Sequence, residues 1–176
     1  MARRIWPFPS SRPSSFPLPL TLSLTLLLLL LTACSQGPGE PNQEELRAEV
    51  QQLLEKNYCP KLGEAYANRD ATRLESFTVP KEISRIARRI EELEAEGKVY
   101  EPIFRQVTVE SVSTWNYSNA FATTVEVWDV RSFTSGSSHQ LVNEQVGQRS
   151  RVKYQLKRQD SDGSWVVLYR ELGENL

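Results

Sequence analysis

The sequence predicts an α+β domain in which N-terminal helices pack on a bent antiparallel sheet of about four strands. Up to Gly97, apolar residues recur every three or four positions, which is the period of an amphipathic helix. After Gly97 they recur at every second position, which is the period of a half-buried strand. Helices followed by strands with turn residues between them are typical of the α+β class.

Composition supports a single globular domain. The chain has 176 residues, of which 39% are apolar and 24% charged, and its net charge is −1. These values exclude collagen, a coiled-coil rod, a disulfide-stapled miniprotein and a multispanning membrane protein. The first 33 residues hold three arginines and no acid, so the remainder is more acidic than the whole chain. An acidic domain lacks the basic footprint of nucleic-acid binding, and we expect no nucleic-acid partner.

The first helix is expected to begin at Asn42, which can cap it together with Glu45. One apolar stripe follows at helical spacing: Leu46, Val50, Leu53, Leu54 and Tyr58. Pro60 should kink or interrupt this helix, because proline has no backbone N–H. A helical face then continues to Asn68.

Two further helices are expected before Gly97. Asp70 can cap a short helix carrying Leu74 and Phe77. The next helix follows Pro80 and carries a second stripe: Ile83, Ile86, Ala87, Ile90 and Leu93. Its charges run from basic to acidic, against the helix dipole, which indicates either a solvated face or a partner surface.

Four strands are expected after Gly97, around Val107–Val109, 121–127, 152–156 and 165–169. Turns are expected at Asn116–Asn119 and at Asp160–Gly163. Residues 132–148 read as a long polar loop, or as a loop with a short strand at Leu141–Val142. Trp128 has the opposite parity to Phe121, Val125 and Val127, so one of the two sets should face outward.

The N-terminus has the layout of a secretory signal, with a basic region, an apolar run of about 14 residues and small residues before a cut. We divide the chain into a signal peptide (1–33), a lipidated cysteine with a flexible tether (34–41) and one α+β domain (42–176). The apolar run is shorter than the roughly 20 residues of a membrane-spanning helix. Leu31-Thr32-Ala33-Cys34 resembles the lipobox of bacterial lipoproteins.

That resemblance implies cleavage between Ala33 and Cys34 and a lipid on the Cys34 thiol. It implies an extracytoplasmic protein anchored to a bacterial membrane. Ser35 follows the cysteine, a pattern that directs enterobacterial lipoproteins to the outer membrane. An ordinary signal peptide and an uncleaved anchor remain as alternatives.

Three stretches of the domain resemble known families. The segment Ala65–Phe77 resembles a helix-turn-helix common in nuclear transport factor 2 (NTF2)-like domains. The segment Ile86–Val112 is similar to a domain of mitochondrial import-motor anchors and plastid division inner-membrane proteins. The closing segment Tyr154–Val167 resembles the final hairpin of both. The resemblance implies a bent sheet wrapped around helices, with a conical pocket and no fixed function.

Two groups of side chains are candidate sites. One is a set of aromatic residues that either line a pocket, reach the surface or only fill the core: Tyr66, Phe77, Trp115, Trp128, Tyr154 and Trp165. The other, which we call the basic stripe, lies on one side of a strand: Arg149, Arg151, Lys153 and Lys157. The stripe either meets anionic lipid headgroups or an acidic partner, or is a solvated face paired with Glu110 or Glu126 across the sheet.

Catalytic and metal sites are not expected. Cys59 is left alone once Cys34 is lipidated, and we expect an inert buried thiol, with a reactive thiol as the alternative. His139 lies in a Ser/Gly-rich loop and should be solvated. A carboxylate, Glu126 or Asp129, with Tyr154 could imitate the site of some enzymes of the family, although nothing in the spacing requires it. We expect no cofactor.

The sequence therefore favours a non-enzymatic envelope lipoprotein whose domain binds a protein partner or a small apolar ligand. The alternative is a hydrophobic-ligand carrier or an enzyme that uses the conical pocket.

Overall fold

The computed structural model describes residues 42–136 and 139–176. The predicted signal peptide, lipobox and tether lie outside these residues. The helical elements are α2 (Gln43–Gln52), η1 (Leu53–Tyr58), α3 (Cys59–Asn68), η2 (Ala71–Leu74) and α4 (Pro80–Ala95). The strands are β1 (Lys98–Asn116), β2 (Asn119–Thr134), β3 (Leu141–Arg158) and β4 (Trp165–Asn175).

The first three helical elements follow one another without a loop. Asn42 caps α2, because its side-chain oxygen accepts a hydrogen bond from the backbone N–H of Glu44 at 3.1 Å. Pro60 lies in the first turn of α3, directly after η1, which has π-helical winding. The predicted interruption at Pro60 is therefore a local change of winding and not a break, since proline is tolerated in the first turn of a helix.

The next two helices follow the predicted capping residues. Asp70 caps η2 by accepting a hydrogen bond from the N–H of Thr72 at 3.1 Å, but η2 ends at Leu74, so Phe77 lies beyond it. In α4 the predicted stripe faces the protein interior, with Ile86, Ile90 and Leu93 buried. Gly97 then turns the chain with a φ of 72°, a conformation that favours glycine.

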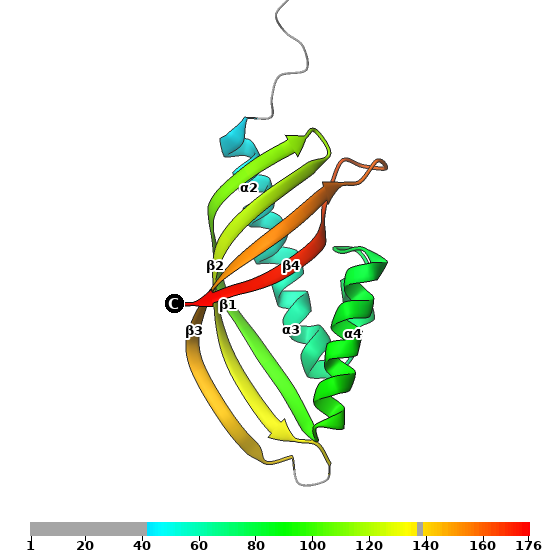
Figure 1. Ribbon diagram of the computed structural model, residues 1–176, viewed down its shortest axis with the longest axis vertical. Helices are drawn as coiled ribbons and strands as arrows, with labels where there is room; N and C mark the ends of the chain where they lie inside the picture. The colour runs from blue at the N-terminus through cyan, green and yellow to red at the C-terminus, as the bar shows by residue number, and fades with distance from the viewer. Residues whose placement is uncertain (1–41, 137–138) are drawn as a thin grey trace, which may run out of the picture. The chain divides into compact units, whose positions relative to one another are not determined.

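The sheet has the order β1-β2-β3-β4, and every neighbouring pair is antiparallel. The strands curve strongly, and the helices lie on one face (Figure 1). Three register shifts between β1 and β2 contribute to the bend, because a bulged strand bends and twists locally. Helices on a bent four-stranded antiparallel sheet confirm the predicted fold class.

The predicted polar loop at 132–148 is wrong, and the strand expected at Leu141–Val142 is present as the start of β3 and not as a separate short element. β2 continues to Thr134 and β3 begins at Leu141, and the two strands pair over this whole stretch. The pairing escapes a pattern-based prediction because β3 is exposed on both faces from Leu141 to Gly147 and so shows no apolar alternation. An ion pair between Arg131 and Glu144, 2.7 Å from Nε to Oε1, joins the strands here.

The even-numbered side chains in the middle of β2 face the helices. Ala122, Thr124, Glu126 and Trp128 are buried on the face that the helices cover, whereas Phe121 on the opposite face is 42% exposed. The sheet therefore carries a carboxylate on its inner face, in place of the aliphatic set that the sequence offered.

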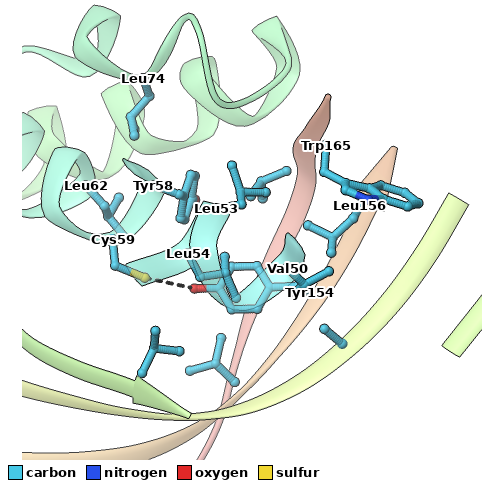
Figure 2. Close-up of a cluster of buried hydrophobic side chains, with 14 of the residues drawn as sticks. Val50, Leu53, Leu54, Tyr58, Cys59, Leu62, Leu74, Tyr154, Leu156 and Trp165 are labelled. Carbon is cyan, nitrogen blue, oxygen red and sulfur yellow. Dashed lines mark hydrogen bonds between the residues drawn. The ribbon is translucent and has the colours of Figure 1, made fainter. Parts of the chain in front are cut away.

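The core lies between η1, α3 and the middle of the sheet. Figure 2 shows Tyr154 reaching from β3 toward Cys59, Leu54 and Leu62 on the helices. Tyr58 meets the Tyr154 ring edge-on, with 5.9 Å between the centroids. In the part of the chain that the structure describes, no helix is long and apolar enough to cross a membrane.

Candidate functional site

A cavity of about 310 Å³ opens beside this core. Its wall comes from α3, α4 and the inner face of the sheet and includes Leu62, Tyr66, Leu93, Tyr100, Trp128 and Arg170. Phe104 packs edge-on behind Trp128, with 5.2 Å between the ring centroids. A concave, largely apolar wall with few polar groups is typical of a small-molecule site.

Glu126 is the buried anion next to this cavity, and its side chain is 0% exposed. Its Oε2 accepts hydrogen bonds from Trp128 Nε1 and from Arg170 Nη2, each at 2.7 Å. Its Oε1 accepts a hydrogen bond from the Tyr154 hydroxyl. Both carboxylate oxygens are thus occupied, and the negative charge is paired with a guanidinium, as a buried charge requires.

Tyr154 extends this network toward the helices. Its oxygen accepts a hydrogen bond from Arg170 Nε at 3.2 Å and lies 3.7 Å from the Cys59 sulfur (Figure 2). Because the phenolic proton goes to Glu126, the Cys59 thiol is the donor in this last contact. Burial raises the pKa values of both Cys59 and Tyr154, and the negative charge of Glu126 adds to each. Both groups are therefore neutral at physiological pH.

Arg170 joins the network to the cavity. Its side chain is 16% exposed. Burial alone would lower the pKa of Arg170, but Glu126 and Tyr154 outweigh it and raise the pKa, so the guanidinium is charged. Nε and Nη2 are used inside the network, whereas Nη1 has no acceptor among the described residues.

Sequence reasoning missed Arg170 because of a bulge. The alternation Trp165, Val167, Tyr169 predicts that these three residues share a face and that Arg170 points away from it. A register shift opposite Gln155 and Leu156 places an extra residue in β4. Beyond it, Tyr169 turns outward and is 40% exposed, and Arg170 turns inward opposite Tyr154. No residue type in this stretch signals the shift.

The structure separates the predicted aromatic residues into four groups. Tyr66 and Trp128 line the cavity. Tyr154 lies behind it, 1% exposed, and Phe77 packs against the core. Trp115 is 78% exposed at the β1–β2 turn.

Trp165 is buried at the other side of the core. Its Nε1 donates to Glu49 at 2.8 Å, and the Arg158 guanidinium lies 4.8 Å above its ring. These contacts give Trp165 a structural role away from the cavity.

The basic stripe lies on the outer face of β3, because its residues alternate with the buried side chains of that strand. Arg151 forms an ion pair with Glu110 of β1, 2.8 Å from Nε to Oε2. Glu126 does not take part, since it faces inward. Arg149, Lys153 and Lys157 have no ion-pair partner among the described residues.

The remaining catalytic candidates lie apart from the network. Asp129 accepts hydrogen bonds from the Gly147 N–H at 2.8 Å and from Arg105 Nε at 2.7 Å, and both contacts lower its pKa. His139 stacks on Phe133, with 4.4 Å between the ring centroids. Within the described residues there is no cluster of three or more metal-ligating side chains of the His, Cys, Asp and Glu types.

A second groove of about 730 Å³ runs between α4 and β4. At its base the buried Glu82 is held by Arg85, whose Nε and Nη2 donate to the two carboxylate oxygens at 2.8 and 2.6 Å. Lys81 and Arg88 line the same groove and have no ion pair within the described part of the chain.

The domain matches a known family in sequence and in structure. The sequence model of the ARC6-like, IMS domain family matches residues 63–167. The intermembrane space region of the chloroplast protein ARC6 is similar in structure, with a TM-score of 0.55, 11% identity and coverage of 76% of this chain and 98% of that chain. This likeness agrees with the predicted resemblance to a plastid-protein domain.

Two further solved structures are less similar. One, from Catenulispora acidiphila, has a TM-score of 0.44 and 18% identity, covering 76% of this chain and 93% of that chain. The other is an NTF2-like protein of unknown function from Shewanella oneidensis MR-1, with a TM-score of 0.41 and 13% identity, covering 72% and 98%. No curated protein matched the sequence. The family match spans more than half of the chain, which therefore belongs to the ARC6-like, IMS domain family.

Proposed function

We propose that this protein is a lipid-anchored envelope protein whose domain binds a small apolar ligand carrying a carboxylate or a similar acceptor group. The observation that carries the proposal is the cavity beside Trp128, with its apolar wall and the guanidinium of Arg170. Its volume lies at the lower end of the roughly 300–1,000 Å³ that is typical of ligand sites.

The charges of the cavity support an acidic or hydrogen-bond-accepting ligand. Arg89 and Arg170 are its two charged lining residues, and the lining contains no carboxylate. Nη1 of Arg170 is free of protein acceptors within the described residues, and a guanidinium edge suits a carboxylate. Tyr66, Tyr100 and Leu93 then offer apolar contact for the rest of the ligand.

The same network argues against catalysis by Glu126. A general base must have a lone pair within reach of the substrate proton. Three of the roughly four lone-pair sites of Glu126 already accept hydrogen bonds, from Tyr154, Trp128 and Arg170, and the carboxylate is 0% exposed. We therefore assign Glu126 to positioning Arg170 and propose a domain that binds its ligand without converting it.

The membrane anchor rests on Leu31-Thr32-Ala33-Cys34 and its position after the apolar run. Thioether-linked diacylglycerol supplies two acyl chains, and two chains hold a protein stably where one binds only marginally. Changing Cys34 to Ser should move the protein from the membrane fraction to the soluble fraction or leave it as an unprocessed precursor without acyl mass. A Cys34→Ser protein that is cleaved at the same site and still carries acyl mass would contradict the anchor.

The cavity is tested with decanoate and decanol as matched probes on the purified full-length lipoprotein. We expect decanoate to bind more tightly than decanol, because only the carboxylate can pair with Arg170. Leu172→Trp at the cavity wall should weaken both probes, whereas Val146→Trp, an exposed position elsewhere in the sheet, should leave both unchanged. Equal affinities for the two probes, or no effect of Leu172→Trp, would overturn the proposed ligand class.

A second function, the binding of an acidic protein partner, is favoured by the groove between α4 and β4. Lys81 and Arg88 present two cations there that no described carboxylate neutralises. A partner bound at this groove should be lost from Lys81→Glu/Arg88→Glu and retained by Lys56→Glu, which changes an exposed lysine outside it. Retention of the partner by the double variant would exclude this groove.

A further inference from the structure

We propose that the turn between β1 and β2 is a membrane-contacting tip that inserts its aromatic side chains into the lipid headgroup region. The proposal rests on the proposed lipid anchor at Cys34 and adds a second, non-covalent contact between the domain and the same membrane.

The chemistry of the hairpin is unusual for an exposed segment. Residues 111–125 contain no Asp, Glu, Lys, Arg or His. Within this stretch Trp115 is 78% exposed, Tyr117 58% and Phe121 42%. The other two tryptophans of the domain, Trp128 and Trp165, are only 7% and 6% exposed. Exposed tryptophan and tyrosine in an uncharged segment suit the membrane–water interface, where one end of the ring is apolar and the other is wet.

The hairpin formed by β1, β2 and their turn lies beside the start of α2, which is the first helix of the domain. The guanidinium of Arg47 in α2 donates to the carbonyl oxygen of Val109 at 2.8 Å and also to that of Glu110. Gln43 and Glu44 line a shallow groove with Ser111 and Val112. Figure 1 shows the start of α2 and the β1–β2 turn at the same end of the domain, with the β2–β3 turn at the opposite end.

The length of the connecting segment limits how far this end can be from the lipid. Seven residues separate Cys34 from Asn42. A fully extended chain spans at most about 3.6 Å per residue, so the start of α2 lies within about 30 Å of the anchored cysteine. The end of the domain with the exposed aromatic residues is therefore the end held next to the membrane.

Charge contributes less than the aromatic residues. Lys157 and Lys153 of β3 pair in register with Asn119 and Thr123 of the hairpin, and a lysine near an anionic surface is worth about 1 kcal/mol. Exposed Glu44 and Glu45 in the first turn of α2 oppose them at the same end. We therefore expect the contact to persist when salt is raised, because burial of the rings carries it.

The test uses the mature lipoprotein reconstituted into vesicles of phosphatidylethanolamine and phosphatidylglycerol, with and without brominated phosphatidylcholine. Bromine quenches only tryptophans that reach the bilayer. We expect the wild-type emission to lose the share that comes from Trp115, and we expect no such loss in Trp115→Phe, which retains the buried Trp128 and Trp165 as an internal baseline.

A matched control moves the exposed tryptophan to a position far from the β1–β2 turn. The double variant Trp115→Phe/Val146→Trp carries its exposed tryptophan on β3, near the β2–β3 turn. Its emission should not be quenched. Equal quenching of the wild type and of this double variant would show that contact with the bilayer is unspecific and would overturn the proposal.

Two outcomes separate this proposal from the proposed function. Acyl mass at Cys34 with an unquenched Trp115 overturns the membrane tip and leaves the anchor standing, and a dimer that shields Trp115 would appear in this way. Absence of acyl mass from protein taken from its host membranes overturns the anchor, and the membrane tip with it.

Discussion

Arg170 and Glu126 form an ion pair inside the domain. Removing the cation leaves an unpaired carboxylate at 0% exposure, and breaking a buried pair in this way costs about 3–5 kcal/mol. We expect Arg170→Met to lower the free energy of unfolding by that amount in urea denaturation. Arg151→Met, which breaks the solvent-screened pair with Glu110, should lower stability far less than Arg170→Met.

A double-mutant cycle tests whether Glu126 and Arg170 stabilise the fold as a pair or independently of each other. Glu126→Gln/Arg170→Met removes both charges and should be less destabilising than the sum of its single variants. Strict additivity would contradict the pairing described above.

The Cys59 thiol makes the free energy of unfolding depend on pH in the alkaline range. Burial, and then Glu126, raise the pKa of its thiol above the usual 9.0, so the folded protein keeps a proton that the unfolded chain loses. The resulting stability is complete below about pH 9 and falls as the pH rises from there toward the folded pKa, by up to about 1.4 kcal/mol per pH unit. Burial also raises the pKa values of Tyr58 and Tyr154, so both tyrosines add to the loss of stability as the pH rises above 10.

Urea denaturation of the wild type and of Cys59→Ala between pH 8 and pH 10 checks this sign. The wild type should lose stability with rising pH, and the variant should lose less. A wild-type stability that rises over this range would contradict the buried neutral thiol.

Tyr58 carries a hydroxyl that no partner satisfies within the described residues. A buried hydroxyl without a hydrogen bond costs about 1–3 kcal/mol, whereas the ring keeps its edge-on contact with Tyr154. Tyr58→Phe should therefore leave the midpoint of thermal unfolding unchanged or raise it. A marked fall would mean that this hydroxyl is bonded after all, to a water molecule for example.

At the scale of elements, α3 approaches β1 through Gly63. A Cβ atom there would lie 2.7 Å from the carbonyl oxygen of Pro102 and 3.6 Å from the Trp128 ring. Because the nearest atom belongs to the backbone, the helix must shift, and such overpacking costs about 1–3 kcal/mol. Gly63→Ala should lower stability by that amount, although alanine is the better helix former.

The same substitution should disturb the cavity, since Trp128 lines it. Decanoate affinity of Gly63→Ala, compared with that of Lys61→Ala at a half-buried position of α3 outside the cavity lining, checks this consequence. Unchanged stability and affinity in Gly63→Ala would contradict the close contact between α3 and β1.

The elements also show what the sequence could predict. Helix stripes, the caps at Asn42 and Asp70 and both short turns follow from local chemistry, and the structure contains them. The pairing of the end of β2 with the start of β3 does not follow, because β3 is exposed on both faces there and lacks the alternation that marks a strand.

The position of Arg170 in the candidate site could not be predicted either, because it depends on a bulge in β4. Period-two alternation places Arg170 on the outer face, and the extra residue near Leu168 reverses it. Residue types offered Glu126 or Asp129 as a carboxylate for Tyr154 without choosing between them, and the structure joins Glu126 to Tyr154. The arginine that completes the contact was not accessible to pattern reasoning.

At the scale of the molecule, our proposals describe one membrane-associated binding protein. We infer the anchor from the resemblance of Leu31-Thr32-Ala33-Cys34 to a lipobox, the ligand class from the cavity, and the contact with lipid from the β1–β2 turn. The bent sheet and the helices on its inner face form the cavity, but a fold by itself does not select a function.

Native mass spectrometry of the protein extracted from its own host membranes tests the central claim most directly. We predict two additions to the mass of the mature chain: an acyl mass that survives denaturation and a small acidic, apolar molecule that is released by it. Acyl mass on an otherwise empty domain that also fails to take up decanoate would contradict ligand binding in the cavity. A chain with neither addition would contradict the account as a whole.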